Sequence, residues 1–483
     1  MAYLGKKGYS ILKSNLTTKE QQFIRDELTV KAYIPKSPVQ PEPFSIYRES
    51  PNKFYVPRYF GVDTFGDFSE NKIPPGDDIN IEFTGDLREY QINIVDKYIN
   101  FVKDSGGGLL DVDPGKGKTV MGLYIIAKLK KKTLVIVHKS FLLNQWIERI
   151  QQFLPTARVG KIQGQIIDIE NKDIVIGMLQ SLSQKEYPEN LFDSFGLTIY
   201  DETHHLGAEV FSRCMMKTIT NYTLGLSGTM QRKDGLTKVF KMFLGDIIHK
   251  EKTDTKEHKV IVKAIHYKVD DEDFNEIKYD YRGNPLYSTM ISKLCSYNHR
   301  SEFILKVLET ELRNNNEQQI MILAHNKSLI TYLHQAIEHR NIATVGYYIG
   351  GMKEADLKIS EGKKVIIATY AMASEGLDIK TLTTLIMASP KTDVCQSIGR
   401  ILRTKHTSPL VVDIIDKHDI FENQWHKRRQ YYMKQKYNII STDNTSYFKN
   451  AWTTVYDPNK SEESIKKIKK TEEPLKGVCL IKL

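Results

Sequence analysis

Short apolar runs alternate with amphipathic stretches along the chain from about Leu87 onward. The runs are four to six residues long, which is typical of buried strands, and stretches such as Phe141–Phe153 carry apolar residues at helical spacing. They form two series separated by a polar interval: Leu109–Val112, Thr133–Val137, Asp173–Met178, Leu197–Tyr200 and Thr223–Leu226, and then Gln319–Ala324, Ala343–Tyr348, Lys364–Thr369, Thr384–Ala388 and Leu410–Ile414. Strands that alternate with helices predict parallel sheets covered on both faces. We therefore expect an α/β protein with two tandem lobes.

Proline and polar residues suggest where these lobes begin and end. Eight of the 16 prolines lie in the first 85 residues, and Pro74-Pro75 precedes a Gly-Asp-Asp turn. The interval Lys250–Asn298 holds four consecutive acidic residues and a Gly-Asn-Pro turn, which favours a linker. We expect a proline-rich accessory module over residues 1–80, a first lobe over 81–250, a linker over 251–298, a second lobe over 299–440 and a tail over 441–483.

Charge and cysteine content narrow the class of protein. The chain has 69 Lys and Arg against 59 Asp and Glu, a formal net charge of +10, which is a weak indication of a polyanionic partner. No apolar run approaches the ~18 residues of a membrane span, and the N-terminus lacks the apolar core of a signal peptide. The four cysteines are far apart in sequence, which predicts reduced thiols in an intracellular compartment, cytoplasmic or nuclear. These features exclude disulfide-rich secreted proteins and membrane proteins.

A phosphate-binding loop is predicted at Asp113–Thr119, between an apolar strand and a helical pattern. Glycines Gly115 and Gly117 let backbone N–H groups turn toward phosphate oxygens, and the start of the helix adds its positive dipole end. Lys118 would bridge the β and γ phosphates of ATP, and the Thr119 hydroxyl would bind Mg²⁺. Val112 stands where the strict motif has glycine.

A carboxylate pair, Asp201 and Glu202, follows the buried run Leu197–Tyr200. Charges at the end of a buried strand are costly unless they have partners or perform chemistry. Asp201 would hold Mg²⁺, and Glu202 would orient or deprotonate the attacking water in phosphoryl transfer. A turn that caps the next helix is the simpler alternative.

In this order the motifs resemble those of the superfamily 2 helicases and translocases, whose series can be followed from Leu87 to about Asp413. The resemblance implies two RecA-like lobes and Mg²⁺-dependent ATP hydrolysis. It implies adenine contacts from Arg88 and Gln91, a DExH box at Asp201-Glu202-Thr203-His204, motif III at Ser227-Gly228-Thr229, motif V from Ala368-Thr369 to Gly376-Leu377-Asp378, and motif VI from Gln396 to Arg403. Gly376 and Asp378 would border ATP, and His204, Ser227, Thr229 and Gln396 would couple hydrolysis to movement. The DETH box, Gln180-Ser181-Leu182 and Arg232-Lys233-Asp234-Gly235 are similar to the XPB-type and UvsW branch and to helicases of large DNA viruses, which extends the expected location to a viral setting.

Arg400 and Arg403 lie three residues apart, so on a helix they share one face. An arginine near the γ phosphate stabilises the charge of the transition state. If their helix belongs to the second lobe, the ATP site is complete only when the lobes close, and closure is then coupled to hydrolysis.

Nucleic-acid contacts are expected at polar residues near strand ends, because a motor grips the sugar-phosphate backbone. Candidates are Lys139, Gln180, Ser181, Gly350 and Thr369. The basic, aromatic stretch Trp425–Asn438 suits either a single-stranded track or a solvated helix packed on the second lobe. The run Tyr47–Phe60 suits either duplex DNA or a small accessory fold.

We expect a monomeric motor without membrane association that acts on nucleic acid, with DNA favoured over RNA. An RNA helicase uses the same chemistry, and an ATP-driven clamp on duplex DNA would need no strand separation. An inactive nucleotide sensor is disfavoured because Lys118, Asp201, Glu202, Arg400 and Arg403 are all present.

Overall fold

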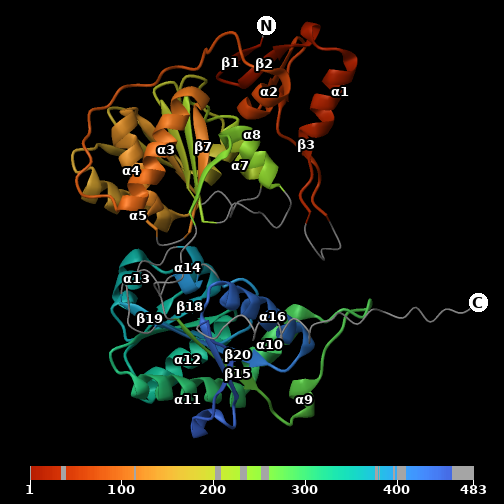
Figure 1. Cartoon of the computed structure of the whole chain (residues 1–483), viewed down its shortest axis with the longest axis vertical. Coiled ribbons are helices and arrows are strands. Elements are labelled where there is room, and N and C mark those ends of the chain that lie inside the picture. The colour runs from red at the N-terminus through yellow and green to blue at the C-terminus, as the bar shows by residue number, and fades with distance from the viewer. Residues whose placement is uncertain are drawn as a thin grey trace, which may run out of the picture. The chain divides into compact units, whose positions relative to one another are not determined.

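The computed structural model describes residues 2–33, 40–113, 116–201, 208–228, 236–251, 260–375, 379, 381–394, 397–399 and 409–458. The chain divides into two compact units, Met1–Thr253 and Asp254–Leu483. Each unit is built around a sheet with helices on both faces (Figure 1). Both units therefore have the α/β class that the two series of apolar runs predict.

The first unit contains an eight-stranded sheet in the order β10-β9-β11-β8-β12-β13-β7-β14. Its strands are β7 (Gly107–Val112), β8 (Thr133–Val137), β9 (Val159–Gln163), β10 (Ile166–Asp168), β11 (Ile174–Met178), β12 (Leu197–Asp201), β13 (Tyr222–Ser227) and β14 (Ile247–Glu251). Strand β10 is antiparallel to β9, and the other described pairs in this sheet are parallel.

Among the described residues, six helices cover this sheet: α3 (Glu89–Ser105), α4 (Lys118–Leu129), α5 (Ser140–Phe153), α6 (Leu179–Gln184), α7 (Ala208–Met215) and α8 (Thr237–Leu244). Successive residues of β8 point to opposite faces, so Leu134 and Ile136 pack with α6, α7 and α8, while Val135 and Val137 pack with α3, α4 and α5. Burial on both faces explains why these strands read as continuous apolar runs.

The N-terminal residues form a smaller fold. Its elements are β1 (Tyr3–Gly5), β2 (Gly8–Leu12), η1 (Lys13–Asn15), α1 (Thr18–Glu27), β3 (Thr29–Val30), β4 (Phe44–Ser45), β5 (Arg48–Glu49), β6 (Lys53–Val56) and α2 (Arg58–Phe65). They make an antiparallel sheet in the order β1-β2-β6-β5 and a separate pair, β3-β4.

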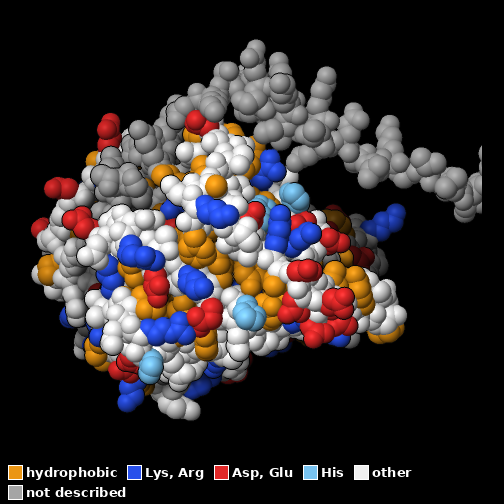
Figure 2. Space-filling model, turned by 90° about the horizontal axis from the view of Figure 1, so that it is seen from below, with side chains coloured by type: hydrophobic (Ala, Val, Ile, Leu, Met, Phe, Trp, Pro, Cys, Tyr) orange, Lys and Arg blue, Asp and Glu red, His pale blue; other side chains and the backbone are white. Residues whose placement is uncertain are grey.

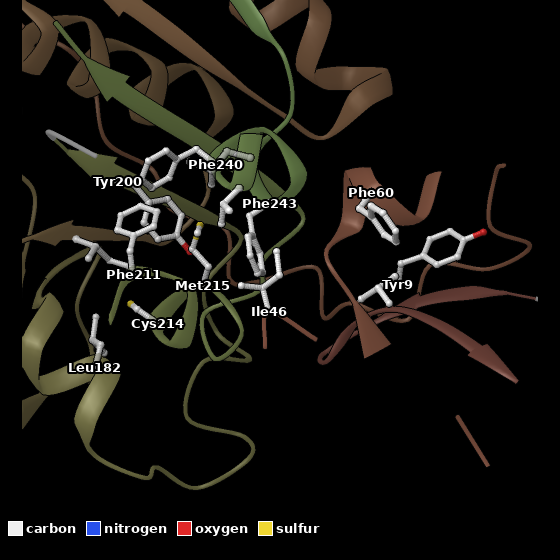
Figure 3. Packing of buried hydrophobic residues seen from close by; sticks show 14 of the residues in the cluster. Tyr9, Ile46, Phe60, Leu182, Tyr200, Phe211, Cys214, Met215, Phe240 and Phe243 are labelled. Atoms are coloured by element: carbon white, nitrogen blue, oxygen red, sulfur yellow. The ribbon is translucent and has the colours of Figure 1, made fainter. Parts of the chain in front are cut away.

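This N-terminal fold shares its hydrophobic core with the first lobe. Tyr9 and Phe60 belong to the same buried cluster as Phe211 of α7 and Phe240 of α8 (Figure 3), and the rings of Phe211 and Phe240 meet edge to face at 4.8 Å. The run Tyr47–Phe60 accordingly supplies β5, β6 and the start of α2 to a packed accessory fold. The module expected over residues 1–80 is thus an integral part of the first unit.

The second unit contains an eight-stranded sheet in the order β17-β18-β16-β19-β20-β15-β21-β22. Its strands are β15 (Ile261–Tyr267), β16 (Gln319–Ala324), β17 (Val345–Tyr348), β18 (Val365–Thr369), β19 (Leu382–Met387), β20 (Leu410–Asp416), β21 (Asn438–Asp443) and β22 (Thr453–Tyr456). Only the β21–β22 pair is antiparallel among the described pairs of this sheet.

The helical elements with described bounds in this unit are α9 (Glu272–Asn275), α10 (Tyr287–Ser296), α11 (Asn298–Asn314), α12 (Lys327–His339), α13 (Glu354–Glu361), α14 (Tyr370–Glu375), α16 (Asp419–Lys434) and η4 (Tyr447–Lys449). Helices α10, α11 and α12 pack on one face of the sheet, and α13, α14 and α16 pack on the other. All ten predicted strands are present in the two sheets, with ends shifted by two residues at most.

The expectation of a linker over residues 251–298 needs correction. Strand β15 lies inside the second sheet, where it pairs with β20 on one side and β21 on the other. Lys263 makes this strand look polar, but its ammonium bonds the buried carboxylate of Glu311 at 2.7 and 2.8 Å. From Val260 onward, the described part of this interval therefore belongs to the second unit, and β15 lies within its sheet.

The expectation of a tail over residues 441–483 also needs correction. Strands β21 and β22 and the turn between them extend the second sheet to Tyr456, so the sheet runs well past residue 441. No helix in the described part of the chain is long and apolar enough to cross a membrane.

Candidate functional site

Those predicted ATP-site residues of the first unit that the structure describes lie at or near the carboxyl edge of its sheet. Asp201 ends β12 and Ser227 ends β13, and the two strands pair in parallel with Asp201 opposite Leu226. Strand β7, which leads into the phosphate-binding loop, pairs with β13 so that Asp111 lies opposite Ser227. Parallel strands bring their carboxyl ends to one edge, which is where open α/β sheets bind ligands.

The described part of the phosphate-binding loop has the backbone that an anion site needs. Gly117 has φ +81° and caps α4, which begins at Lys118. A Cβ atom at Gly117 would lie 2.4 Å from Nε2 of Gln91, so both the conformation and the close approach require glycine. Lys118 is buried and Thr119 is half-buried, both in the first turn of a helix whose free N–H groups favour an anion.

Helix α3 is tied to this loop by two side chains. Nε2 of Gln91 donates to the carbonyl oxygen of Lys116 at 2.8 Å, and the hydroxyl of Tyr90 donates to the same oxygen at 3.0 Å. Oε1 of Gln91 accepts from the N–H of Arg88 at 2.9 Å. An amide has two donor hydrogens and two acceptor lone pairs, so Gln91 can hold the loop and still meet adenine. The adenine contacts of Arg88 and Gln91 stay predictions, and the structure adds a positioning role for Gln91.

The buried carboxylate of Asp201 is oriented by a residue that the motifs do not include. The indole Nε1 of Trp146 donates to Oδ2 of Asp201 at 2.8 Å. Trp146 lies on α5 and is 1% exposed. A buried indole needs a hydrogen-bond acceptor. The tryptophan in the amphipathic stretch Phe141–Phe153 was therefore the only sign in the sequence that this hydrogen bond would form. Its partner could be found only once β12 was placed beside β8.

The oxygen ligands at this edge fit Mg²⁺. Among the described residues, no group of three or more His, Cys, Asp or Glu side chains is placed to hold a metal ion. Mg²⁺ ordinarily takes one or two protein oxygens and completes its shell with water and phosphate. A threonine hydroxyl and a carboxylate, from Thr119 and Asp201, meet that requirement.

Three of the predicted nucleic-acid contacts share this edge. Lys139 follows β8, and Gln180 and Ser181 follow β11, two strands that pair in parallel with Val137 opposite Met178. Nε2 of Gln180 donates to the carbonyl of His138 at 2.9 Å, and Oγ of Ser181 accepts from the N–H of Gly164 at 2.9 Å. Burial lowers the pKa of the Lys139 ammonium. Gln180 thus holds the backbone next to Lys139, and Ser181 holds the turn at Gly164. A phosphate contact from Lys139, Gln180 or Ser181 stays a prediction.

The other two predicted contacts lie at neighbouring strand ends in the second unit. Gly350 follows β17 and Thr369 ends β18, and these strands pair with Tyr348 opposite Ala368. Gly350 is exposed, and a Cβ atom there would meet open space. The hydroxyl of Thr369 accepts from the N–H of Met372 at 3.4 Å.

Several predicted site residues lie outside the described residues. They are Gly115, Glu202, His204, Thr229, Gly376, Asp378, Gln396, Arg400 and Arg403.

The basic stretch Trp425–Asn438 forms most of α16 and packs on the second sheet. Arg428 is buried in a bidentate pair with Asp413 at 2.8 and 2.9 Å, and Tyr432 and Tyr437 are also buried. The packed-helix alternative is therefore the correct one for these side chains, since buried rings cannot stack on bases. On the face drawn in Figure 2, basic and acidic side chains are interspersed, so the charge there is mixed.

Known families match both units. Residues 84–232 match the family model "Type III restriction enzyme, res subunit", and residues 302–405 match "Helicase conserved C-terminal domain". The chain belongs to the superfamily 2 helicases and is an ATP-hydrolysing enzyme, as the motif resemblance predicts.

Individual relatives extend this match beyond the two family models. A putative ATP-dependent RNA helicase, L396, of Acanthamoeba polyphaga mimivirus is 36% identical over 95% of this chain and 90% of its own length. The putative helicase 161L of Invertebrate iridescent virus 6 is 26% identical over 75% of this chain and 84% of its own length. A solved structure of T4 UvsW covers 88% of this chain and 96% of that chain, with 18% identity and a TM-score of 0.33. Viral helicases are thus among its relatives, as the sequence resemblance predicts.

Proposed function

We propose that this helicase couples hydrolysis of Mg²⁺-ATP to movement along DNA by holding the sugar-phosphate backbone. The observation that supports this most directly is the shared edge of the first sheet. Lys118 and Asp201 lie at the same carboxyl edge as Lys139, Gln180 and Ser181. The strands β7, β13, β12, β8 and β11 of one sheet therefore connect the proposed ATP-phosphate groups with the proposed nucleic-acid contacts.

In this proposal Thr119 and Asp201 hold Mg²⁺ with their oxygens, and Trp146 orients the Asp201 carboxylate. When bound there, Mg²⁺ would supply positive charge against the β and γ phosphates. Lys118 contacts the same phosphates, and the helix start at α4 supplies backbone N–H donors.

DNA is the favoured substrate because the DETH box and the Arg232–Gly235 segment are similar to the XPB-type and UvsW branch. RNA is the second candidate, because the L396 relative is named an RNA helicase. Contacts to phosphate oxygens alone do not separate the two, since the 2′-hydroxyl is the group by which a protein distinguishes RNA from DNA.

The deciding measurement is the ATPase rate with duplex DNA, single-stranded DNA and single-stranded RNA of matched sequence, together with strand displacement. We expect DNA to stimulate hydrolysis and Lys139→Ala to raise the DNA concentration needed for half-maximal stimulation. Lys128→Ala, at an exposed lysine of α4, is the control. Stimulation by RNA alone would overturn the DNA assignment, and DNA stimulation without displacement would assign a translocase or duplex clamp.

A further inference from the structure

The loop after β19 is held by side chains from four different helices. Its four consecutive carbonyl oxygens, at residues 388–391, each accept a hydrogen bond from one side chain. The donors are Arg300 of α11 to Ala388 at 2.7 Å, Tyr370 of α14 to Ser389 at 2.6 Å, Tyr287 of α10 to Pro390 at 3.5 Å and Arg428 of α16 to Lys391 at 2.7 Å. We refer to Ala388–Lys391 as the four-carbonyl loop.

Each of the two arginine donors is itself held in place by a buried aspartate. Arg300 binds Asp416 through two nitrogens at 2.6 and 2.8 Å, and Arg428 binds Asp413 through two nitrogens at 2.8 and 2.9 Å. Both carboxylates lie on β20, and all four side chains are at most 1% exposed. A planar guanidinium bound at two points has little freedom, so its third nitrogen fixes the position of the loop carbonyl.

Tyr370 makes the contact at the centre of the loop. Its side chain is 4% exposed, and burial raises the pKa of its hydroxyl, which therefore stays protonated and acts as a donor. Ser389 is fully buried, and its Oγ accepts from the N–H of His325 at 3.0 Å and lies 2.9 Å from His325 Nδ1. Ser389 is thus held at both its carbonyl and its hydroxyl.

The hydrogen bond from Tyr370 to Ser389 joins two segments that carry predicted motifs. Tyr370 directly follows Thr369, the predicted nucleic-acid contact of motif V. After the four-carbonyl loop, the chain leads to Val394 and then to the helical residues Ser397–Gly399. The N–H of Ile398 donates to the carbonyl oxygen of Val394 at 2.9 Å. Arg400 and Arg403 of motif VI come next in the chain and lie outside the described residues. One hydrogen bond therefore joins the end of β18 to the segment that leads into motif VI.

We propose that Tyr370 is a positioning residue. It transmits the effect of nucleic-acid binding at Thr369 to the four-carbonyl loop, and from there along the chain to the arginines of motif VI. This inference rests on the proposed function, in which Thr369 contacts nucleic acid. A phosphate bound at Thr369 restrains the first turn of α14, and the Tyr370 hydroxyl transfers that restraint to Ser389. Coupling between two binding sites is reciprocal, so the nucleotide also changes nucleic-acid affinity through the same bond.

The test is Tyr370→Phe, which removes the hydroxyl and keeps the ring. We expect the ratio of nucleic-acid-stimulated to unstimulated ATPase rate to fall about tenfold, the effect of leaving one buried carbonyl without its donor. The Kd for the oligonucleotide in the absence of nucleotide should stay within about twofold, because Tyr370 does not itself contact nucleic acid. The change in this Kd caused by a non-hydrolysable ATP analogue should shrink toward none.

Tyr447→Phe is the matched control. Tyr447 is also 4% exposed, and its hydroxyl donates to Glu311 at 2.6 Å, away from the four-carbonyl loop. Tyr287→Phe removes the longest bond of the loop and should lower the stimulation ratio by a smaller factor than Tyr370→Phe.

The outcomes separate this inference from the proposed function. Equal stimulation of Tyr370→Phe and wild-type protein would overturn the role of Tyr370, and so would an equal loss in Tyr370→Phe and Tyr447→Phe. A wild-type enzyme that no DNA or RNA stimulates would instead contradict the proposed function. Loss in Tyr370→Phe with a normal Tyr447→Phe supports the inference.

Discussion

The two eight-stranded sheets differ in the side chains that bind the buried acids Asp201, Asp413 and Asp416 near their carboxyl edges. In the first sheet, Asp201 accepts a hydrogen bond from a neutral indole, that of Trp146. In the second sheet, Asp413 and Asp416 are each bound by two nitrogens of a buried arginine. A guanidinium that binds a carboxylate through two nitrogens both orients it and adds an opposite charge, whereas an indole N–H orients a carboxylate without adding a charge of its own. We therefore expect changes at the first edge to act mainly on the proposed ATP chemistry, and changes at the second edge to act mainly on stability.

The largest effect that this contrast predicts is loss of activity at the first edge. Lys118→Ala should lower the ATPase rate by about 10³-fold or more, because a charge that stabilises the transferring phosphates is removed. Steady-state ATPase measurements with and without nucleic acid test this. Lys128→Ala, an exposed lysine on the same helix, should hydrolyse ATP normally, and near-normal turnover by Lys118→Ala would contradict the assignment of the edge.

The next effect is a loss of stability at the second edge. Arg428→Met should lower the free energy of unfolding by about 3–5 kcal/mol, because it leaves Asp413 charged and buried. Urea unfolding of the full chain measures this change. Arg158, whose side chain is 61% exposed in its pair with Asp173, is the control, and Arg158→Met should change the unfolding midpoint far less.

The double variant Arg428→Met with Asp413→Leu sharpens this test. It removes both charges and should recover part of the lost stability, because the uncompensated carboxylate is the main cost. No recovery would mean that the packing of Arg428, and not its charge pairing, carries the effect.

A smaller effect is expected for the neutral donor at the first edge. Trp146→Phe keeps an aromatic ring and removes the N–H, so the Asp201 carboxylate is less well oriented. We expect the Mg²⁺ concentration for half-maximal binding of a fluorescent ATP analogue to rise about tenfold, with a parallel fall in ATPase rate. Trp452→Phe also loses an indole N–H bond, to Asn450 in the second unit, and should leave both quantities unchanged. Unaltered Mg²⁺ dependence in Trp146→Phe would remove the proposed role of the indole.

The smallest effect concerns pH at the second edge. Burial, with repulsion from Lys391, lowers the pKa of His325 to about 4 from its ordinary 6.5. His325 is therefore neutral when folded, and the unfolded chain binds the additional proton as the pH falls below 6.5. Its contribution to stability is complete above pH 6.5 and is lost on acidification toward pH 4.

Thermal unfolding between pH 7 and 5 measures this contribution. The midpoint of His325→Gln should fall less steeply with acidification than that of the wild-type protein, while His426→Gln, at an exposed histidine, should follow the wild-type slope. Parallel slopes in His325→Gln and wild-type protein would show that another group is responsible.

The sequence predicted the parts of the fold that are buried on both faces. Nine of the ten apolar runs became central strands, which have no solvent face to interrupt their pattern, and the tenth became the edge strand β17. Strand β15 was wrongly assigned to a linker because Lys263 and His266 interrupt its pattern, and Lys263 is paired with Glu311, which lies 48 residues further along the chain. Strand β21 was divided by the expected end of the second lobe because Asn438, Ser441 and Asp443 give it a polar appearance.

The site was predicted where spacing along the chain determines the chemistry. Lys118, Thr119 and Asp201 could be proposed from the sequence because a phosphate-binding loop and a strand-end carboxylate are local patterns, and their roles stay predictions. The proposed roles of Trp146 and Tyr370 could not be predicted, because each rests on one hydrogen bond to a residue 55 or 19 positions away. Such contacts depend on which strands become neighbours, and that order is set by the tertiary fold.

The place of β15 also has a consequence for how the second unit is made during synthesis. This strand lies between β20 and β21, so neither of its partners exists until translation has passed residues 416 and 443. Its apolar residues Val262, Ala264 and Ile265, all fully buried in the folded protein, must wait for about 150 further residues before they are covered. Contacts this distant in sequence form slowly, and apolar surface that waits for them is prone to aggregate. A ribosome-bound chain ending before β20 should therefore carry an open sheet edge that invites chaperones, and the last strands close it in a late step of folding.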